Sequence, residues 1–442
     1  MKSSAYREWS GALREGRAPL CLSGNVDTQL MHLTAELCSG YKRVLVLTYN
    51  EIRAKELYED AAAFLSLSPS LYPARDLLFW GADVSGSLLA RERMLVLKHL
   101  LEQENAFVVT TADALLDRLS SPAYLKKNVI RLEAGGVHDL SELARKLSGL
   151  GFIRTEVVDM PGEFAVRGGI LDIYPLTEEN PVRVEFWDDE IDAIRSFDPV
   201  SQRSIENLES LSVYPAAESG DEAGCLLDYV GPDDCLVLDE PARIKDRTEA
   251  VAKEYQESIL RRIESAKAEG AEIPHFPVLH DTRTLMKALD RPHTLILTGL
   301  DYRDDPVPAG LHDHVDARSL PSYAGHFDLL IKDLEKAKKE KTCTVLMCSS
   351  RARAERLARD LAEYELNAFY AEAPDREVMP GQILVTYGSI HKSFAYPSLK
   401  FSVLSESDVF GRRQNKKRRT FSKGGTRVSS ISDLSVGDYV IH

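Results

Sequence analysis

The sequence predicts an α/β protein built on a parallel sheet that helices cover on both faces. Two observations indicate this class. Short apolar runs such as "PLCLSG", "RVLVLTYN" and "AFVVTTAD" alternate with longer amphipathic segments over residues 18–120. The same alternation returns after residue 213, beginning with "CLVLDEP". Buried runs separated by helices are typical of parallel sheets that are covered on both sides.

Length and composition place the chain among soluble globular proteins. It has 442 residues, of which 44% are hydrophobic and 28% charged, and at roughly 100–200 residues per domain it should hold two to four domains. No apolar run approaches the roughly 18 residues of a membrane span, and the polar start "MKSSAYREWS" favours a cytoplasmic protein with no membrane partner. The net charge of −14 argues against nucleic-acid binding by the whole surface.

Residues 121–212 have a different pattern from the segments on either side of them. Strands with a two-residue period occur in "EFAVRGGILDIYP" and "PVRVEFWDDEIDAIRSFDP", which is typical of a sheet with one solvent-exposed face. We therefore expect an inserted α+β domain with an antiparallel sheet. Residues 1–120 and 213–305 are expected to form the two parts of a single α/β domain around this insertion.

The remaining residues predict a third unit and a linker. Residues 306–410 contain a buried strand, "KTCTVLMCSS", and an amphipathic helix, "RARAERLARDLAEYEL", which indicate a smaller α/β domain. Residues 411–432 are basic and poor in apolar side chains, so we expect a flexible linker. Residues 433–442, "DLSVGDYVIH", begin a strand that cannot fold alone. We expect the natural protein to continue beyond His442.

The basic linker is a candidate contact for DNA. Residues 411–427 carry eight Lys or Arg residues and no acid. Specific DNA binding there would weaken steeply with salt, whereas the alternative is a solvated spacer with no such site. The candidate side chains are Arg412, Arg413, Lys416, Lys417, Arg418 and Arg419.

The stretch "LCLSGNVDTQLMHL" has the outline of a phosphate-binding loop without its chemistry. A strand runs into Gly24 and a helix follows, but the second glycine of the motif falls on Gln29. Its lysine falls on Leu30 and its hydroxyl on Met31. A phosphate loop needs the lysine for the outer phosphates and the hydroxyl for Mg²⁺. We predict a degenerate loop whose Leu30 and Met31 pack under the helix.

A second trace of a nucleotide site is the acid pair Asp239-Glu240, which follows the apolar strand of "CLVLDEP". Such acids position Mg²⁺ and water in ATPases of this kind, although a turn after a core strand is an equally simple explanation. The six cysteines form no C-x-x-C pair and the histidines no recognisable motif. We expect reduced core cysteines, no cofactor, no metal site and no catalytic residue in this chain.

The sharpest prediction concerns the exposed face of the inserted sheet. In "VRVEFW", alternation places Val182, Val184 and Phe186 on the core face. Arg183 and Trp187 then point outward, and Arg167 does the same at the end of "EFAVR". Arginine and tryptophan are enriched at binding hot spots.

The alternative explanation for this face is structural and involves no partner. The two arginines would then pair with acids nearby, and Trp187 would fold over the edge of the sheet. The candidate acids are Glu163, Glu185 and Asp188. The run Asp188-Asp189-Glu190 is expected to be a solvated turn.

Residues 160–216 resemble the segment that UvrB shares with the transcription-repair coupling factor (Mfd) family. The motifs "RGGILDIYP", "VRVEFWDDEIDAIRSFDP" and "QRS" follow one another in order. The lost phosphate loop favours the coupling factors over UvrB. The tail "LSVGDYVIH" favours them too, because it resembles the start of their RNA-polymerase-interacting domain.

This resemblance implies a degenerate RecA/helicase-like domain and a role in transcription-coupled nucleotide excision repair. The matching motifs place the contacts with UvrA on Arg167, Arg183 and Trp187, where another aromatic residue is common at the last position. The family's ATP-driven motor and its RNA polymerase contact would lie beyond this chain. The alternative is a UvrB-like ATP-dependent helicase or translocase component with a divergent nucleotide loop.

Overall fold

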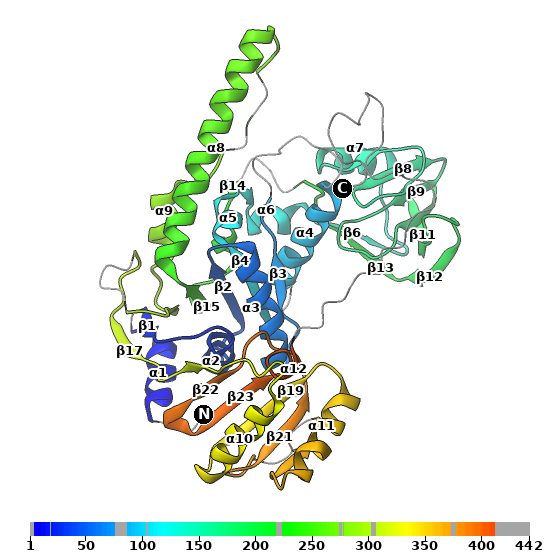
Figure 1. Cartoon of the computed structure of the whole chain (residues 1–442). Helices are drawn as coiled ribbons and strands as arrows, with labels where there is room; N and C mark the ends of the chain where they lie inside the picture. Colours follow the sequence, from blue (N-terminus) through cyan, green and yellow to red (C-terminus); the bar gives the residue numbers. More distant parts are fainter. Residues whose placement is uncertain are drawn as a thin grey trace, which may run out of the picture.

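The structure is a computed structural model that describes residues 4–17, 19–75, 86–102, 105–217, 223–273, 276, 278–301, 306–372 and 377–411. Its strands form three large sheets, each with its own helices (Figure 1). Residues 412–442, which hold the predicted basic linker after its first residue and the ten residues that follow it, lie outside the described residues.

The first sheet has seven strands, and every neighbouring pair is parallel. Their spatial order is β17-β1-β16-β15-β2-β4-β3. Their bounds are β1 (Leu20–Ser23), β2 (Arg43–Thr48), β3 (Ser70–Tyr72), β4 (Ala106–Thr111), β15 (Cys235–Asp239), β16 (Thr294–Leu297) and β17 (Leu311–His314). Alternate residues of the central strands enter two separate cores, as in β2, where Leu45 and Leu47 face one core and Val44 and Val46 the other.

Helices cover both faces of this sheet, as the buried strand runs predicted. One face packs against α1 (Ser4–Arg14), α2 (Gln29–Leu37) and α3 (Glu51–Phe64). The other packs against α4 (Gly86–Glu102), α5 (Ala112–Leu116), α8 (Pro241–Glu269) and α9 (Thr282–Ala288). Helix α8 begins with a proline, is capped at its C-terminus by Gly270 with φ of 65°, and extends well beyond the sheet (Figure 1).

The second sheet belongs to residues that separate β4 from β15 in the chain. Its order is β12-β11-β10-β9-β8-β7, and all pairs are antiparallel except β7 with β8. Helix α7 (Leu140–Gly149) and the pair β6 (Ile130–Glu133) with β13 (Ser210–Val213) close the core on one face. The strands are β7 (Ile153–Arg154), β8 (Glu163–Arg167), β9 (Ile170–Ile173), β10 (Val182–Trp187), β11 (Glu190–Phe197) and β12 (Ser204–Leu208).

Short elements connect this inserted sheet to the first one. They are β5 (Leu119–Ser120), which pairs with β14 (Ala223–Gly224), together with α6 (Pro122–Asn128) and the 3₁₀ turn Leu226–Tyr229. Ser121 caps α6, because its side chain accepts a hydrogen bond from the backbone N–H of Tyr124, and Pro122 opens the helix.

The third sheet has the order β18-β22-β23-β19-β21-β20. Its strands are β18 (Arg318–Ser319), β19 (Cys343–Cys348), β20 (Ala368–Tyr370), β21 (Ile383–Tyr387), β22 (Phe394–Tyr396) and β23 (Phe401–Ser405). Its helices are α10 (Phe327–Lys339), α11 (Arg351–Glu363) and α12 (Glu406–Phe410). The three sheets confirm the predicted fold class: a parallel α/β domain, an inserted α+β domain and a smaller α/β domain.

One predicted boundary needs correction. The third domain was expected to begin at residue 306, but β17 pairs in parallel with β1, so Leu311–His314 complete the first sheet. This strand reads "LHDH" and three of its four residues are exposed. It therefore lacks the apolar run by which a buried strand is predicted from sequence.

All six cysteines are free thiols. Four are buried, and the Sγ atoms of Cys38 and Cys235 lie 3.4 Å apart in the core under α2. Burial raises the pKa of the Cys235 thiol well above its ordinary value. Within the described part of the chain, no helix is long and apolar enough to cross a membrane.

Candidate functional site

The outer face of the inserted sheet carries the three predicted residues. Trp187 ends β10 and is 82% exposed. The Arg167 side chain, at the end of β8, is 52% exposed, whereas that of Arg183 is only 21% exposed. The alternation argument thus placed all three on the correct face. It did not show that Arg183 is held down against the sheet.

Asp172 explains the position of both arginines. It lies on β9 between β8 and β10, directly opposite Arg183 in the strand register. Arg183 donates to it from Nε at 2.7 Å and from Nη2 at 2.9 Å, while Arg167 Nη2 donates at 2.8 Å. The Asp172 carboxylate is almost completely buried beneath the two guanidinium groups. We call Arg167, Asp172, Arg183 and Trp187 the arginine face.

Two of the three acids named as alternative partners have contacts elsewhere, and the third, Asp188, lies in the exposed turn after Trp187. Glu163 accepts the backbone N–H groups of Asp159 and Met160, at 2.9 Å each. Glu185 pairs with Arg195. Arg167 and Arg183 are therefore paired with an acid, as the explanation without a partner required. That acid is Asp172, which the sequence analysis did not name.

The Arg183 guanidinium lies over the ring of Phe197. Alternation along β11 puts Phe197 on the same face as Arg195, which lies opposite Arg183. The guanidinium carbon of Arg183 is 4.8 Å from the Phe197 ring centroid, and Phe197 is 1% exposed. A cation over an aromatic face is favourable. The hydrogen bond to Asp172 is the main cause that raises the pKa of Arg183, so this side chain is a fixed cation.

Trp187 stands beside a tight hairpin end. It pairs with Glu190 across a two-residue turn in which Asp188 has φ of 57°. The backbone N–H of the preceding residue, Phe186, donates to Gly169 O at 2.8 Å, which joins this hairpin to the β8–β9 turn. The run from Asp188 to Glu190 is exposed, as expected for a solvated turn. The indole is consequently an uncovered apolar surface on a rigid hairpin.

The degenerate phosphate loop is closed by the chain itself. Leu30 and Met31 are buried, as predicted. The backbone N–H of Asn25 donates to Thr298 O at 3.1 Å, and that of Val26 donates to Gln29 Oε1 at 3.0 Å. In a working loop such N–H groups face phosphate. Here they are used within the protein.

The last residue of β17 and the residue after it cover the same loop. A Cβ atom built on Gly24, which has φ of 81°, would lie 2.4 Å from His314 Cε1 and 2.6 Å from Val315 O. Val315 N in turn donates to Ser23 O at 2.8 Å. There is thus no room beside Gly24 for even a methyl group.

The two acids after β15 have structural partners. Asp239 is 2% exposed and accepts hydrogen bonds from Thr48 Oγ1 at 2.7 Å and Arg53 Nε at 3.1 Å. Glu240 accepts the backbone N–H of Gly299 at 2.7 Å, and burial raises the pKa of Glu240. A guanidinium thus neutralises the acid that a metal would neutralise in an ATPase. Among the described residues, no cluster of His, Cys, Asp and Glu could hold a metal ion.

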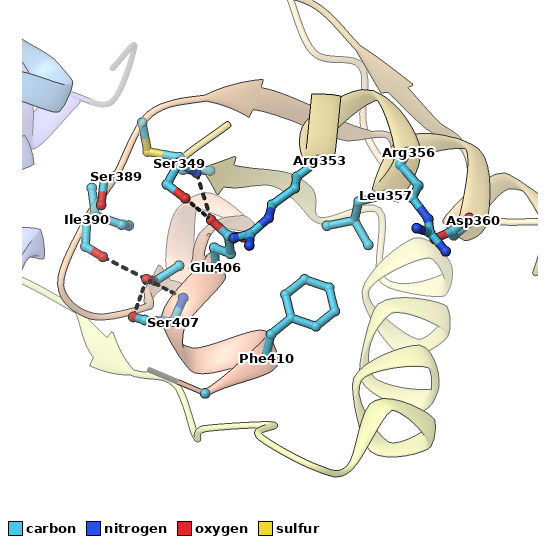
Figure 2. A pocket seen from close by; sticks show the side chains of 13 residues that line it. Ser349, Arg353, Arg356, Leu357, Asp360, Ser389, Ile390, Glu406, Ser407 and Phe410 are labelled. Atoms are coloured by element: carbon cyan, nitrogen blue, oxygen red, sulfur yellow. Dashed lines mark hydrogen bonds and ion pairs between the residues drawn. The ribbon is translucent and has the colours of Figure 1, made fainter. Parts of the chain in front are cut away.

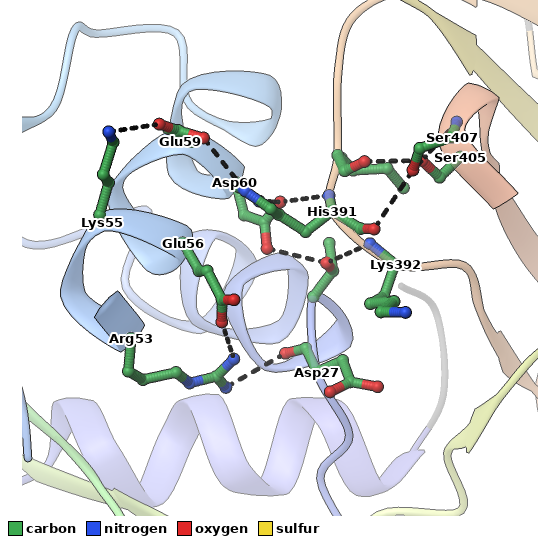
Figure 3. Close-up of polar contacts among 12 residues, drawn as sticks. Asp27, Arg53, Lys55, Glu56, Glu59, Asp60, His391, Lys392, Ser405 and Ser407 are labelled. Atoms are coloured by element: carbon green, nitrogen blue, oxygen red, sulfur yellow. Dashed lines mark hydrogen bonds and ion pairs between the residues drawn. The ribbon is translucent and has the colours of Figure 1, made fainter. Parts of the chain in front are cut away.

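The helix that follows the degenerate loop binds the third domain. We call residues 389–394 the docking loop. Thr28 Oγ1 donates to Asp60 at 2.8 Å and accepts the backbone N–H of Lys392 at 3.0 Å. His391 contacts the other oxygen of Asp60 through its backbone N–H at 2.8 Å and Nδ1 at 3.0 Å. Figure 3 shows Asp60 and His391 facing each other between the two domains.

Tyr396 extends this contact along α2. Its hydroxyl accepts a hydrogen bond from Gln29 Nε2 at 3.1 Å and lies 3.1 Å from His32 Nδ1. Burial lowers the pKa of His32 to about 4, so this imidazole is neutral at pH 7. The position that the phosphate-loop motif reserves for glycine is thus occupied by a glutamine that binds another domain.

A cavity of about 540 Å³ opens at the carboxyl ends of β19, β21 and β23. Ligands often bind at this edge of a parallel sheet. Figure 2 shows Ser349 and Arg353 pointing at Glu406. Glu406 accepts the Ser349 backbone N–H at 2.8 Å and bonds Arg353 at 2.5 Å. The chain's own carboxylate therefore takes the donors that an anionic ligand would use.

The fold defines an α/β protein with an inserted α+β domain, and the outer sheet face of that domain carries the arginine face. Residues 130–218 match the family model of the UvrB interaction domain, and these residues contain the whole arginine face. The match therefore covers the inserted sheet and leaves the first and third sheets outside it.

Over its full length the chain is similar to transcription-repair-coupling factors. That of Bacillus subtilis (strain 168) is 27% identical over 511 residues, which cover 100% of this chain and 42% of the relative. That of Staphylococcus haemolyticus is 24% identical and covers 91% of this chain and 39% of the relative. The resemblance predicted from the sequence is confirmed: the chain is similar to these factors over its whole length and spans about two fifths of theirs.

Among solved structures, an XPD helicase aligns with 87% of this chain and 79% of its own, at 10% identity and a TM-score of 0.27. A likeness this weak carries no information about the fold or the site.

Proposed function

We propose that this chain recruits UvrA through the arginine face of its inserted domain. The observation that carries the proposal is the arrangement of Arg167, Arg183 and Trp187 on one outer sheet face. This face lies within the segment that matches the UvrB interaction domain. A fixed pair of cations beside an uncovered indole is the composition of a binding hot spot.

The chemistry of the face suits a partner that offers acidic and apolar groups together. Arginine has five N–H donors in a planar fork, and the bond to Asp172 uses one of those of Arg167. Charge-assisted hydrogen bonds from the remaining donors would set the orientation of the partner. Trp187, 82% exposed, would provide the apolar anchor.

We propose further that the chain turns over no ATP of its own. The backbone donors of the degenerate loop are used internally, and Arg53 pairs with Asp239. Both observations speak against the alternative of a helicase-like ATPase with a divergent loop. Mg-ATP turnover that Asp239→Ala abolished would overturn this part of the proposal.

The proposed setting is transcription-coupled nucleotide excision repair. It rests on the similarity to transcription-repair-coupling factors, two fifths of whose length the chain spans. RNA polymerase would be bound by the domain of which residues 433–442 are the start, and the linker cations Arg412 to Arg419 would contact DNA. Affinity for DNA that did not change with salt would argue against the linker contact.

Calorimetric titration of this chain with purified UvrA tests the recruiting role. We expect Arg183→Ala and Trp187→Ala each to weaken binding at least about tenfold, a loss of roughly 1.4 kcal/mol or more. Arg145→Ala is the matched control, because Arg145 is exposed on α7, which packs on the core face of the same sheet. Its effect should stay within about twofold.

Two results would contradict the proposal. One is the absence of UvrA binding by a well-folded wild-type chain. The other is binding that Arg183→Ala, Trp187→Ala and Arg145→Ala leave equally intact.

A further inference from the structure

We infer that Asp172 is a positioning residue of the arginine face, which sets the geometry and charge that Arg167 and Arg183 present to a partner. The inference rests on the proposed function. It adds a residue that would never touch the partner, since the two guanidinium groups cover its carboxylate.

The burial of Asp172 comes from the arginines and not from the domain core. On β9, Leu171 and Ile173 enter the core, so alternation turns Asp172 to the opposite face. Its strand neighbours in the register are Ala165 and Arg183. The alanine leaves space beside the carboxylate. Two arginine side chains close over that space, which leaves Asp172 1% exposed.

The three charges do not cancel. Two guanidinium groups share one carboxylate, so the cluster retains a net positive charge. A buried carboxylate must be paired to remain charged, and here the pairing is arranged so that the unbalanced charge faces solvent. The cluster therefore favours a partner that contributes an acidic group.

Asp172 restrains the two arginines to different degrees. Arg183 donates to Asp172 through two nitrogens. Its guanidinium also lies over the Phe197 ring and donates to Gln202 Oε1 at 3.3 Å. Arg167 donates to Asp172 through one nitrogen only. Ordering a long side chain before binding lowers the entropy lost on binding. Asp172 should therefore act mainly through Arg183.

A double-mutant cycle separates positioning from a general structural role. We expect Asp172→Asn, nearly isosteric but neutral, to weaken UvrA binding about tenfold in calorimetry. In an Arg183→Ala background the same change should cost about twofold or less, because the group it acts through is gone. Glu185→Gln is the control: it removes an acid from the same face, but one paired with Arg195.

Arg183→Lys provides a second test if Asp172→Asn does not fold. Lysine keeps the charge but cannot bind a carboxylate through two nitrogens in a plane. We expect it to weaken binding nearly as much as Arg183→Ala does. Wild-type affinity for Arg183→Lys would overturn the inference.

An Asp172→Asn effect that is equally large with and without Arg183 would also overturn it, while leaving the recruiting role of the face intact. A wild-type chain that does not bind UvrA is a different result, because it removes the proposed function itself.

Discussion

The imidazole Nδ1 of His391 lies 3.0 Å from a carboxylate oxygen of Asp60, although 331 positions separate the two residues in the chain. The backbone N–H of His391 donates to the same oxygen at 2.8 Å. Nε2 of His391 lies 3.1 Å from Glu59. The third domain is therefore joined to α3 by a histidine set between two carboxylates.

This contact makes the docking of the third domain dependent on pH. The hydrogen bond to Asp60 is the main cause that raises the pKa of His391, and the charges of Asp60, Glu59 and Glu56 add to it. The stabilising contribution is fully present below the unfolded pKa of about 6.5 and is lost as pH rises through the folded pKa. We expect the melting temperature of the wild type to exceed that of His391→Gln at about pH 6 and to approach it at about pH 9. A difference that grew with pH would contradict this assignment.

Removing the Thr28 hydroxyl should loosen the docking loop. Thr28→Val removes the hydroxyl that donates to Asp60 and accepts the backbone N–H of Lys392. We expect a loss of about 1–3 kcal/mol in unfolding free energy, with faster amide exchange in residues 389–394. Thr34→Val is the control, because the Thr34 hydroxyl is also buried but donates to Leu30 O within its own helix, α2. Equal losses in both variants would mean that the docking contacts add nothing.

Gly24 is a test of how tightly the degenerate loop is closed. Gly24→Ala places a methyl group 2.4 Å from His314 Cε1. Gly168→Ala is the control, since Gly168 also has positive φ, 59°, but no atom lies within 4 Å of the new Cβ. The control should cost about 1 kcal/mol for backbone strain, and Gly24→Ala clearly more. Urea unfolding of both variants measures the difference, and equal costs would show that the loop has room.

Restoring the motif residues should not restore nucleotide binding. A variant with Gln29→Gly, Leu30→Lys and Met31→Thr completes the phosphate-loop sequence from Gly24. Its backbone would still direct the Asn25 N–H at Thr298 and keep His314 against Gly24. We expect no binding of a fluorescent Mg-nucleotide. Affinity at about 1 μM, roughly 8 kcal/mol, would show that only side chains had been lost.

Some of the site could be predicted because strand geometry is local. A two-residue period fixes which face Arg183 and Trp187 share, whatever the rest of the fold does. Packing of Leu30 and Met31 followed from their apolar character. Asp172 was missed for a different reason: its role depends on the register that places β9 between β8 and β10, and the sequence does not state that register.

The docking loop could not have been predicted from local patterns. It joins residues from both ends of the chain, and the motif "SIHKSF" is unremarkable by itself. The strand Leu311–His314 was missed because its side chains are mostly polar and exposed at the sheet edge. In both cases the determining partner lies hundreds of residues away, where hydrophobic periodicity carries no signal.

The pairing of Arg53 with Asp239 limits how this sequence can vary. A buried carboxylate that loses its cation, or a buried cation that loses its carboxylate, costs several kcal/mol, about 3–5 when one partner is removed, and here both side chains are largely enclosed. Replacement of either residue alone is therefore expected to lower the free energy of unfolding strongly. Changes at the two positions are therefore expected to be coupled, so that a substitution of Asp239 is best tolerated when Arg53 is replaced at the same time. In this chain the acid at the end of β15 is part of an internal ion pair, which explains its burial without a bound metal.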